Sequence, residues 1–305
     1  MEVRQLQTFC VLAEELNFTR TAERVHTVQS NVTSQIKALE AELGSPLFDR
    51  LAKRVMLTEA GHRFRPFAEK ALAAMDEGCR VVKFGTEPAG PLHIYSPESV
   101  LTYRLPEILK LFRRRYPRVE LIFRPESDRR LADELENGRV DLAISMSDSI
   151  DAEHLSSIRI RTEDVYLFTT PDHPLASGKK VFPKDLLNET LLLTEAGCGY
   201  RKKLDMQLAA ASVRPQHVTE FSSVEAIKQC VSAGMGIGLL PEIVIACELK
   251  RKEFALVNWH RPMSIATHIL WHRDKWLSPG MQAFLELLTV RLQRASPAPL
   301  QELAV

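Results

Sequence analysis

Residues 18–65 constrain the fold of this chain more than any other segment. Their pattern predicts a short helix over residues 20–26 with Thr19 as its N-cap, then a three-residue turn, then a longer helix from Gln29 to a stop at Gly44. The longer helix has apolar side chains at helical spacing, namely Val32, Ile36, Leu39 and Leu43. Two short helices joined by such a turn form a helix-turn-helix.

The segments on either side complete a small domain. A first helix is expected near the N-terminus, because apolar residues again recur at helical spacing: Leu6, Phe9, Ala13 and Leu16. After the longer helix, Val55 and Leu57 alternate with polar residues over residues 49–58, which predicts a short two-stranded wing. We therefore expect a mainly helical winged helix-turn-helix domain over residues 1–58.

The exposed side chains of the third helix suit the major groove of DNA. A helix fits that groove, and the side chains of its first turns meet the base edges. The candidates for base contacts are Gln29, Ser30, Asn31, Thr33 and Ser34. Lys37, Arg50, Lys53 and Arg54 are the candidates for phosphate or minor-groove contacts. The alternative is a solvated polar helix face.

Net charge does not decide this question. Lys and Arg number 40 in the chain and Asp and Glu number 39. Within residues 18–65, eight basic side chains stand against five acidic ones, a local net charge of +3. Binding to double-stranded DNA is therefore inferred from the pattern of residues.

A long helix follows the wing. Thr58 is expected to cap it, and it runs from Glu59 to about Phe84. Its apolar residues alternate in steps of four and three: Phe64, Ala68, Ala71, Met75, Gly78 and Val82. This spacing is typical of a dimerisation helix, although packing against its own domain is the alternative. With the hinge composition of residues 85–91, it forms a linker over residues 59–90.

The remaining residues, 91–305, alternate between strand and helix patterns. Strands are expected at 92–95, 119–123, 140–144, 165–169, 191–194, 237–240 and 265–271. Helices are expected at 101–115, 128–137, 201–211, 223–233 and 279–292. This alternation predicts an α/β fold with parallel sheets covered by helices. A break near residues 150–161 favours two lobes around a cleft, lobe I at about 91–161 and 268–295 and lobe II at about 162–267.

The N-terminal motifs FTRTAERVH, QIKALEAELGSPLFDR and LTEAG, with Gln29 opening the third helix, resemble the LysR-type transcriptional regulators. The resemblance implies a dimer or tetramer that binds interrupted palindromes and is regulated by a small co-inducer. The family usually has Val-Ser before this glutamine and Pro after it, where this chain has Thr27, Val28 and Ser30. Ser34 replaces the usual arginine, so base contacts are better supported at Gln29 and Thr33.

The C-terminal motifs RLPEILKLFRRRYPRVEL, GRVDLAI, GCGYRKKLD and EFSSVEAIKQCVSAGMGIGLLP resemble the co-inducer domain of the same family, whose fold is that of periplasmic binding proteins. In such a fold the ligand lies at the carboxyl ends of the strands, where helix N-termini suit an anionic effector. The expected effector-binding residues are Ser99, Val100, Thr102, Ser127, Ser145, Cys198, Arg201 and Ser222. Plain N-caps, and a salt bridge for Arg201, are the alternatives.

Cys198 raises the question of redox sensing. A thiol at a helix N-terminus beside Arg201 can become reactive, and the family's peroxide sensors carry a cysteine pair in this region. Here position 207 is a glutamine, which favours a thiol that lines the ligand site or packs. The five cysteines are odd in number and scattered, and none of the Cys or His spacings suits zinc. No metal and no other cofactor is expected.

The combined pattern favours one function over two alternatives. A solute-binding protein of transport is opposed by the first 85 residues and by an N-terminus unlike a signal peptide. An enzyme is opposed by the lack of a nucleophile–base or metal motif. We expect a cytoplasmic regulator, not bound to a membrane, that binds DNA as a homodimer or homotetramer and contacts RNA polymerase.

Overall fold

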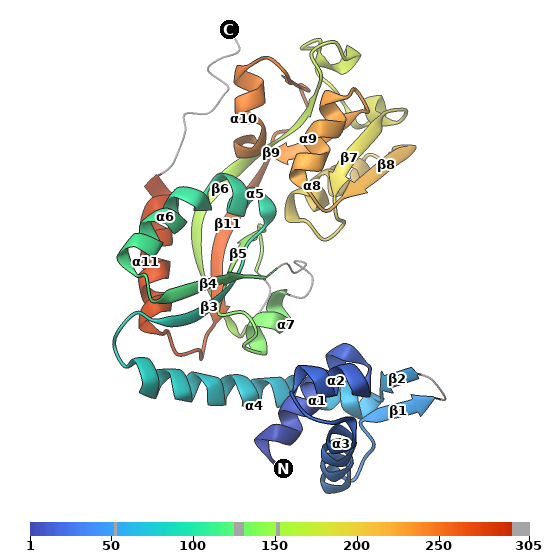
Figure 1. Ribbon diagram of the computed structural model, residues 1–305. Helices are drawn as coiled ribbons and strands as arrows, with labels where there is room; N and C mark the ends of the chain where they lie inside the picture. Colours follow the sequence, from blue (N-terminus) through green and yellow to red (C-terminus); the bar gives the residue numbers. More distant parts are fainter. Residues whose placement is uncertain (52–53, 125–130, 151–152, 295–305) are drawn as a thin grey trace. The chain divides into compact units, whose positions relative to one another are not determined.

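The computed structural model describes residues 1–51, 54–124, 131–150 and 153–294 (Figure 1). Two compact units are distinguished by their internal contacts. The first contains residues 1–86 and 133–140, and the second contains the rest of the chain. No helix within the described ranges is long and apolar enough to cross a membrane.

The first unit is a winged helix-turn-helix followed by a long helix, as the sequence predicts. Its elements are α1 (Val3–Glu15), α2 (Phe18–Arg24), α3 (Gln29–Leu43), β1 (Phe48–Leu51), β2 (Arg54–Leu57) and α4 (Glu59–Phe84). The strands β1 and β2 pair antiparallel and form the wing. The core lies between α1, α3 and the start of α4, where the ring of Phe9 is 5.5 Å from that of Phe48 and 5.2 Å from that of Phe64.

The helix ends follow the predicted capping except in α2. Asn17, not Thr19, caps this helix, because its Oδ1 accepts from the backbone N–H groups of Thr19 and Arg20 at 2.9 and 3.1 Å. Gly44 ends α3 with φ +69°, a conformation that glycine adopts without strain. Thr58 begins α4, since its hydroxyl accepts from the N–H of Gly61 at 3.0 Å.

The apolar stripe of α4 is divided between two environments. Phe64 and Ala68 pack against the core of the first unit. Further along the helix, the side chains of Met75 and Val82 are exposed, as is that of Phe67, which lies outside the predicted seam. The start of the stripe thus packs on its own domain, and the rest leaves apolar surface exposed, so the role of that part in dimerisation stays a prediction.

The second unit is built on one sheet in the order β4-β3-β5-β11-β6-β9-β7-β8, with β10 paired to β6. Its strands are β3 (Gly90–Tyr95), β4 (Val119–Phe123), β5 (Leu142–Met146), β6 (Leu155–Thr169), β7 (Thr190–Thr194), β8 (His217–Phe221), β9 (Ile237–Pro241), β10 (Ala255–Leu256) and β11 (Met263–His272). Its helices are α5 (Glu98–Tyr103), α6 (Leu105–Arg115), α8 (Gly199–Ala210), α9 (Val224–Ser232), α10 (Glu242–Lys250) and α11 (Pro279–Arg294). Most of α7 (Leu131–Glu136) is counted with the first unit.

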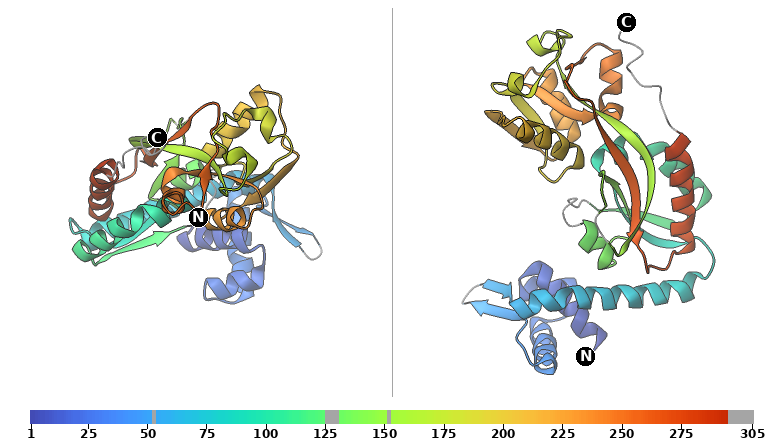
Figure 2. Two further views of the ribbon diagram at one scale, coloured as in Figure 1. Left: turned by 90° about the horizontal axis from the view of Figure 1, so that it is seen from above. Right: turned by 180° about the vertical axis from the view of Figure 1, so that it is seen from behind.

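The expected parallel strands form two groups, and two strands whose antiparallel direction was not anticipated join them. Strands β3, β4 and β5 are parallel, and so are β7, β8 and β9, but β6 and β11 run antiparallel to their neighbours. These two long strands lie side by side and continue from one parallel group to the other (Figure 2). Each parallel group with its helices forms a lobe, so two lobes share a single sheet.

Several other elements differ from the sequence pattern. Strand β6 begins at Leu155, where a break between lobes was expected. The helix predicted over residues 101–115 is two helices, since Pro106 favours a new helix start and α5 ends at Tyr103. Strand β8 and helix α10 have no counterpart among the predicted elements.

Candidate functional site

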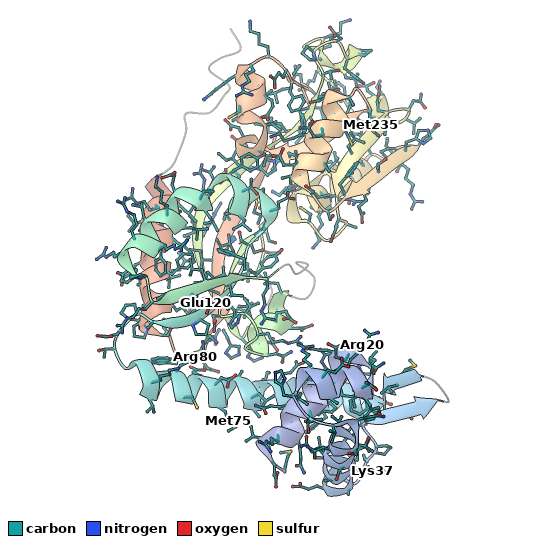
Figure 3. All side chains as sticks on the ribbon, in the orientation of Figure 1. Arg20, Lys37, Met75, Arg80, Glu120 and Met235 are labelled. Carbon is teal, nitrogen blue, oxygen red and sulfur yellow. The ribbon has the colours of Figure 1, made fainter. Side chains whose placement is uncertain are left out.

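The DNA-reading face predicted for α3 is exposed. Gln29, Ser30, Asn31, Ser34 and Lys37 are all exposed, and Thr33 is half-buried. The opposite face of the helix holds Val32, Ile36 and Leu39, which are fully buried in the core of the first unit. The 3.6-residue period of α3 thus places the side chains that pack in the core on one face and the polar ones that can contact DNA on the other. Lys37 on α3 and Arg20 on α2 are labelled in Figure 3.

Local contacts divide these polar residues into two groups. The amide of Asn31 donates to the hydroxyl of Thr27 at 2.8 Å, which fastens the first turn of α3 to the preceding turn. Val28 is the N-cap of α3, and its side chain makes no capping hydrogen bond. The start of α3 is thus held by Thr27 and Asn31, while the other polar side chains project from its exposed face.

The strand register gives the backbone positions of two basic wing residues. Arg50 lies in β1 and Arg54 in β2, and the register pairs Arg50 with Val55 and Leu51 with Arg54. Lys53 lies outside the described residues. The predicted role of the wing in phosphate or minor-groove contact stays a prediction.

A cavity of about 880 Å³ lies in the second unit where strands of both parallel groups end. Its lining begins at the carboxyl ends of β3, β4, β5, β7 and β8, the edge of the sheet at which ligands bind in such folds. The lining residues are Tyr95, Ser96, Pro97, Glu98, Ser99, Leu101, Phe123, Arg124, Met146, Thr194, Glu195, Ala196, Gly197, Cys198, Tyr200, Glu220, Phe221, Ser222 and Val224. They come from both lobes.

Three of the predicted effector residues line this cavity: Ser99, Cys198 and Ser222. Four others are not part of the lining that the structure describes: Val100, Thr102, Ser145 and Arg201. Of these, Val100 and Ser145 are buried, and Thr102 is exposed. Ser127 lies outside the described residues.

Arg201 forms ion pairs within its own lobe. Its guanidinium donates to the carboxylate of Glu220 and to the backbone carbonyl of Thr194, and its Nε lies 3.5 Å from the carboxylate of Asp205. The salt-bridge alternative noted for this residue matches its surroundings better than contact with an effector. Burial raises the pKa of Asp205, and the charge of Arg201 acts in the opposite direction.

Ser99 and Tyr200 are uncharged polar residues of the lining. Ser99 is buried, and its hydroxyl donates to the Sδ of Met146 at 3.4 Å. Burial raises the pKa of Tyr200 well above its usual value, so the phenol stays neutral at the cavity wall. Gly199 packs so closely that a Cβ there would lie 2.0 Å from the carbonyl oxygen of Met146. This close approach brings the start of α8 against the end of β5.

Cys198 is the N-cap residue of α8 and is half-buried. The position of the second cysteine in the family's peroxide sensors is occupied by Gln207, which accepts a hydrogen bond from the indole N–H of Trp259 at 2.7 Å. Gln207 therefore fixes α8 to the segment after β10. This arrangement favours the interpretation of Cys198 as a lining thiol.

Glu98 is a functional candidate that the sequence pattern did not reveal. Its carboxylate accepts from the hydroxyl of Ser223 at 3.0 Å and from the backbone N–H of Val224 at 2.7 Å. The sequence indicates that Ser223 begins a helix, and the structure shows its hydroxyl accepting from the N–H of Ala226 at 3.4 Å. The carboxylate partner is 125 residues away, and no local pattern connects the two.

The charges around the cavity do not favour an anionic effector. Among the lining residues that the structure describes, Glu98, Glu195 and Glu220 carry carboxylates, whereas Arg124 carries a guanidinium. Glu220 is paired with Arg201, so the lining charges left to face a ligand are those of Glu98, Glu195 and Arg124, of which two are negative.

Comparison with known proteins agrees with both halves of this architecture. Residues 3–62 match the bacterial regulatory helix-turn-helix protein, lysR family, and residues 85–293 match the LysR substrate binding domain. The chain is 42% identical over 290 residues to the uncharacterized HTH-type transcriptional regulator YwqM of Bacillus subtilis (strain 168), covering 94% of this chain and 98% of that protein. It is 30% identical to the HTH-type transcriptional regulator GltR of the same organism, covering 97% and 99%.

The fold is also found in solved structures. Full-length CbnR in complex with its target DNA superposes with a TM-score of 0.66 at 23% identity, covering 96% of this chain and 100% of CbnR. A full-length variant of OxyR from Pseudomonas aeruginosa gives a TM-score of 0.68 at 24% identity, covering 97% and 96%. This chain belongs to the LysR family of bacterial transcriptional regulators. It is a DNA-binding regulator with a small-molecule effector domain, and its family is not one of enzymes.

Proposed function

We propose that α3 reads base edges through Gln29 and Thr33, with Ser30 and Ser34 as further contacts and Lys37 on a phosphate. One observation carries this proposal: the polar face of α3 is exposed over its first two turns, while the apolar face is buried. An amide side chain can bond adenine through two hydrogen bonds, and a threonine can contact bases or a thymine methyl group. Arg50, Lys53 and Arg54 of the wing are proposed to contact the DNA backbone.

We infer that the cavity between the lobes holds the small effector. Ser99, Cys198 and Ser222 are the proposed contacts retained from the sequence, together with Glu98, Arg124 and Tyr200. Because most lining charges are negative, we replace the expected anionic effector with a neutral or cationic one. An effector that binds one arrangement of the lobes better than another shifts the population toward that arrangement.

The proposed assembly is a homodimer or homotetramer on an interrupted palindrome. Exposed apolar side chains of α4 support it, because a monomer would leave them in water. A regulator of this kind works in the cytoplasm, where it changes promoter geometry or contact with RNA polymerase.

The test of DNA reading starts from duplexes selected by the full-length protein from a random library. The affinity of wild type, Gln29→Ala and Thr33→Ala is then measured on the selected duplex and on a scrambled one. Each substitution is expected to weaken specific binding by about 1–3 kcal/mol, roughly 5- to 150-fold in Kd, and to leave non-specific binding nearly unchanged.

The matched control is Gln7→Ala, which removes the same side chain from an exposed position on α1. It is expected to bind both duplexes like wild type. Equal affinity of wild type for selected and scrambled DNA would refute sequence reading. A loss in Gln7→Ala as large as that in Gln29→Ala would show that α3 is not the reading helix.

A further inference from the structure

Glu98 places a carboxylate at the start of helix α9. Val224 is the first residue of this nine-residue helix, and its N–H donates to Glu98 at 2.7 Å. The hydroxyl of Ser223, the N-cap, donates to the other carboxylate oxygen at 3.0 Å. The positive end of the helix dipole lies at this point, so these are the contacts that a bound anion makes there. In this molecule the protein supplies the anion itself.

The carboxylate is held in place by a second contact between the same two helices. Tyr103 of α5 donates its hydroxyl hydrogen to the carboxylate of Glu225 on α9. Lys228 of α9 donates to the hydroxyl oxygen of Tyr103 at 2.9 Å and lies 5.2 Å from the centre of its ring. Glu98 and Tyr103 are five residues apart on α5, so α5 is joined to the first turns of α9 at both of its ends, and Glu98 is held opposite Val224.

The two titratable groups of this second contact, Lys228 and Tyr103, keep the same charge around neutral pH. Burial acts to lower the pKa of Lys228, but hydrogen bonds with Glu248, Tyr103 and Glu225 outweigh it and hold the pKa above its usual value. Burial and the hydrogen bond to Glu225 raise the pKa of Tyr103 to about 12. The ammonium and the neutral phenol therefore persist at the pH where the regulator works, and the link between α5 and α9 persists with them.

Two other groups that could attract an anion near α9 are also engaged, while Arg124 is a further cation of the lining. Arg201, at the start of α8, pairs with Glu220 and Asp205 of its own lobe. The N–H of Val224 is taken by Glu98. An effector carboxylate that approached α9 would have to displace Glu98 and leave that carboxylate without its two donors.

We propose that Glu98 is a specificity-determining residue, a built-in carboxylate that excludes anionic groups of effectors from the start of α9. Glu98 also lines the cavity, so its carboxylate presents acceptor capacity to whatever binds there. The effector that fits this side of the cleft carries hydrogen-bond donors, such as an ammonium or hydroxyl group, instead of a carboxylate. The inference rests on the proposed function of the cleft as the effector site. It restricts the expected effectors to those without a carboxylate on the side that faces α9.

The test is chemical rescue by acetate in the full-length protein. Glu98→Ala removes the carboxylate and leaves the hydroxyl of Ser223 and the N–H of Val224 facing an empty position of carboxylate size. Sodium acetate at about 100 mM, against sodium chloride at equal ionic strength, is expected to raise the unfolding midpoint of this variant by about 2–4 °C. The midpoints of wild type and Glu98→Gln, in which the position is filled, are expected to move by less than about 1 °C under the same conditions.

Two controls tie the rescue to this position. Glu107→Ala removes an exposed carboxylate from α6 and should gain no response to acetate, because its side chain is 82% exposed and opens no such position. Adding Ser223→Ala to Glu98→Ala removes one of the two donors and should diminish the acetate effect. Glu98→Ser is made in parallel, so that the test does not depend on the folding of one variant.

The proposal is overturned if acetate stabilises wild type as much as Glu98→Ala, because the start of α9 would then be open. It is equally overturned if acetate stabilises neither Glu98→Ala nor Glu98→Ser, because the position would then hold no anion. The readout is unfolding without DNA. Failure here is therefore distinguishable from failure of the proposed regulator function, which is measured by DNA affinity.

Discussion

At the scale of single residues, Asp141 is a buried carboxylate with two strong partners. It is 2% exposed and lies directly before β5. It accepts from the backbone N–H of His93 at 2.7 Å, and its other oxygen lies 2.8 Å from the ammonium of Lys275. Burial acts to raise its pKa, but the hydrogen bond from His93 and the charge of Lys275 outweigh burial and hold the pKa well below its usual value.

The depressed pKa sets the direction of a pH dependence. Asp141 contributes stability above its unfolded pKa of about 4, and this contribution is lost as pH falls through the lower folded value. We expect Asp141→Asn to lower the free energy of unfolding at pH 7 by about 3–5 kcal/mol, because it leaves the ammonium of Lys275 buried without its counter-charge. The loss in stability of wild type below pH 4 should be smaller in the variant.

The measurement is urea unfolding at pH 7 and at lower pH, followed by tryptophan fluorescence. All three tryptophans (Trp259, Trp271 and Trp276) lie in the second unit, so the signal reports on that unit. Glu120→Gln, which changes an exposed carboxylate on β4, is the control and should unfold like wild type. An Asp141→Asn variant as stable as wild type at pH 7 would contradict this account.

At the scale of elements, the start of α3 is less well capped than it could be. Val28 occupies the N-cap with φ −98° and ψ 152°, makes no side-chain capping bond and is 65% exposed. The family that the sequence resembles usually has a serine here. A serine hydroxyl accepts from the first amide groups of a helix, and valine does not.

We therefore expect Val28→Ser to stabilise the first unit by about 1 kcal/mol, because little buried surface is lost and a capping bond is gained. Val28→Ala is the matched control, since it removes the same apolar surface without adding an acceptor. The measurement is thermal unfolding followed by circular dichroism at 222 nm. If serine and alanine give the same midpoint, the hydroxyl does not cap α3.

The elements also show how far the sequence alone could be interpreted. Helices with one buried face, such as α3 and α4, were predicted to within a residue or two, because their period separates apolar from polar side chains. Strand β8 was missed because most of its residues are exposed, so no alternation marks it. The start of β6 was missed because Arg161 and Glu163 are charged, and their burial is explained only by partners such as Arg104.

The same limit applies to the candidate site. The carboxyl ends of the strands identified Ser99, Cys198 and Ser222, because that rule needs only the order of strands and helices. Glu98 was not predicted, and the two interpretations of Arg201 were left open, because their surroundings depend on which side chains of distant segments face them. The order of strands and helices in the sequence predicts where the cleft lies. The charge of its lining depends on ion pairs and hydrogen bonds between residues far apart in the sequence.

At the scale of the whole molecule, the question is how copies of the chain associate. The exposed apolar side chains of α4 recur at helical spacing, namely Phe67, Ala71, Met75 and Val82, with the exposed Gly78 on the same stripe. Phe67 is 70% exposed and Val82 is 87% exposed, which is costly in water unless a second copy covers them. A dimer joined through α4 presents two copies of α3, and a palindrome is the DNA sequence that matches this symmetry.

We expect Met75→Glu and Val82→Glu to weaken self-association, because each places a charge in the apolar interface. Association is measured by sedimentation equilibrium of the full-length protein, with Asp76→Ala, an exposed neighbour outside the stripe, as the control. Affinity for a selected palindrome should fall by at least tenfold in both variants, since two linked modules bind with higher avidity than one. Affinity for an isolated half-site should not change, because α3 is intact. If both variants remain dimeric at micromolar concentration, the stripe on α4 is not the surface that joins the protomers.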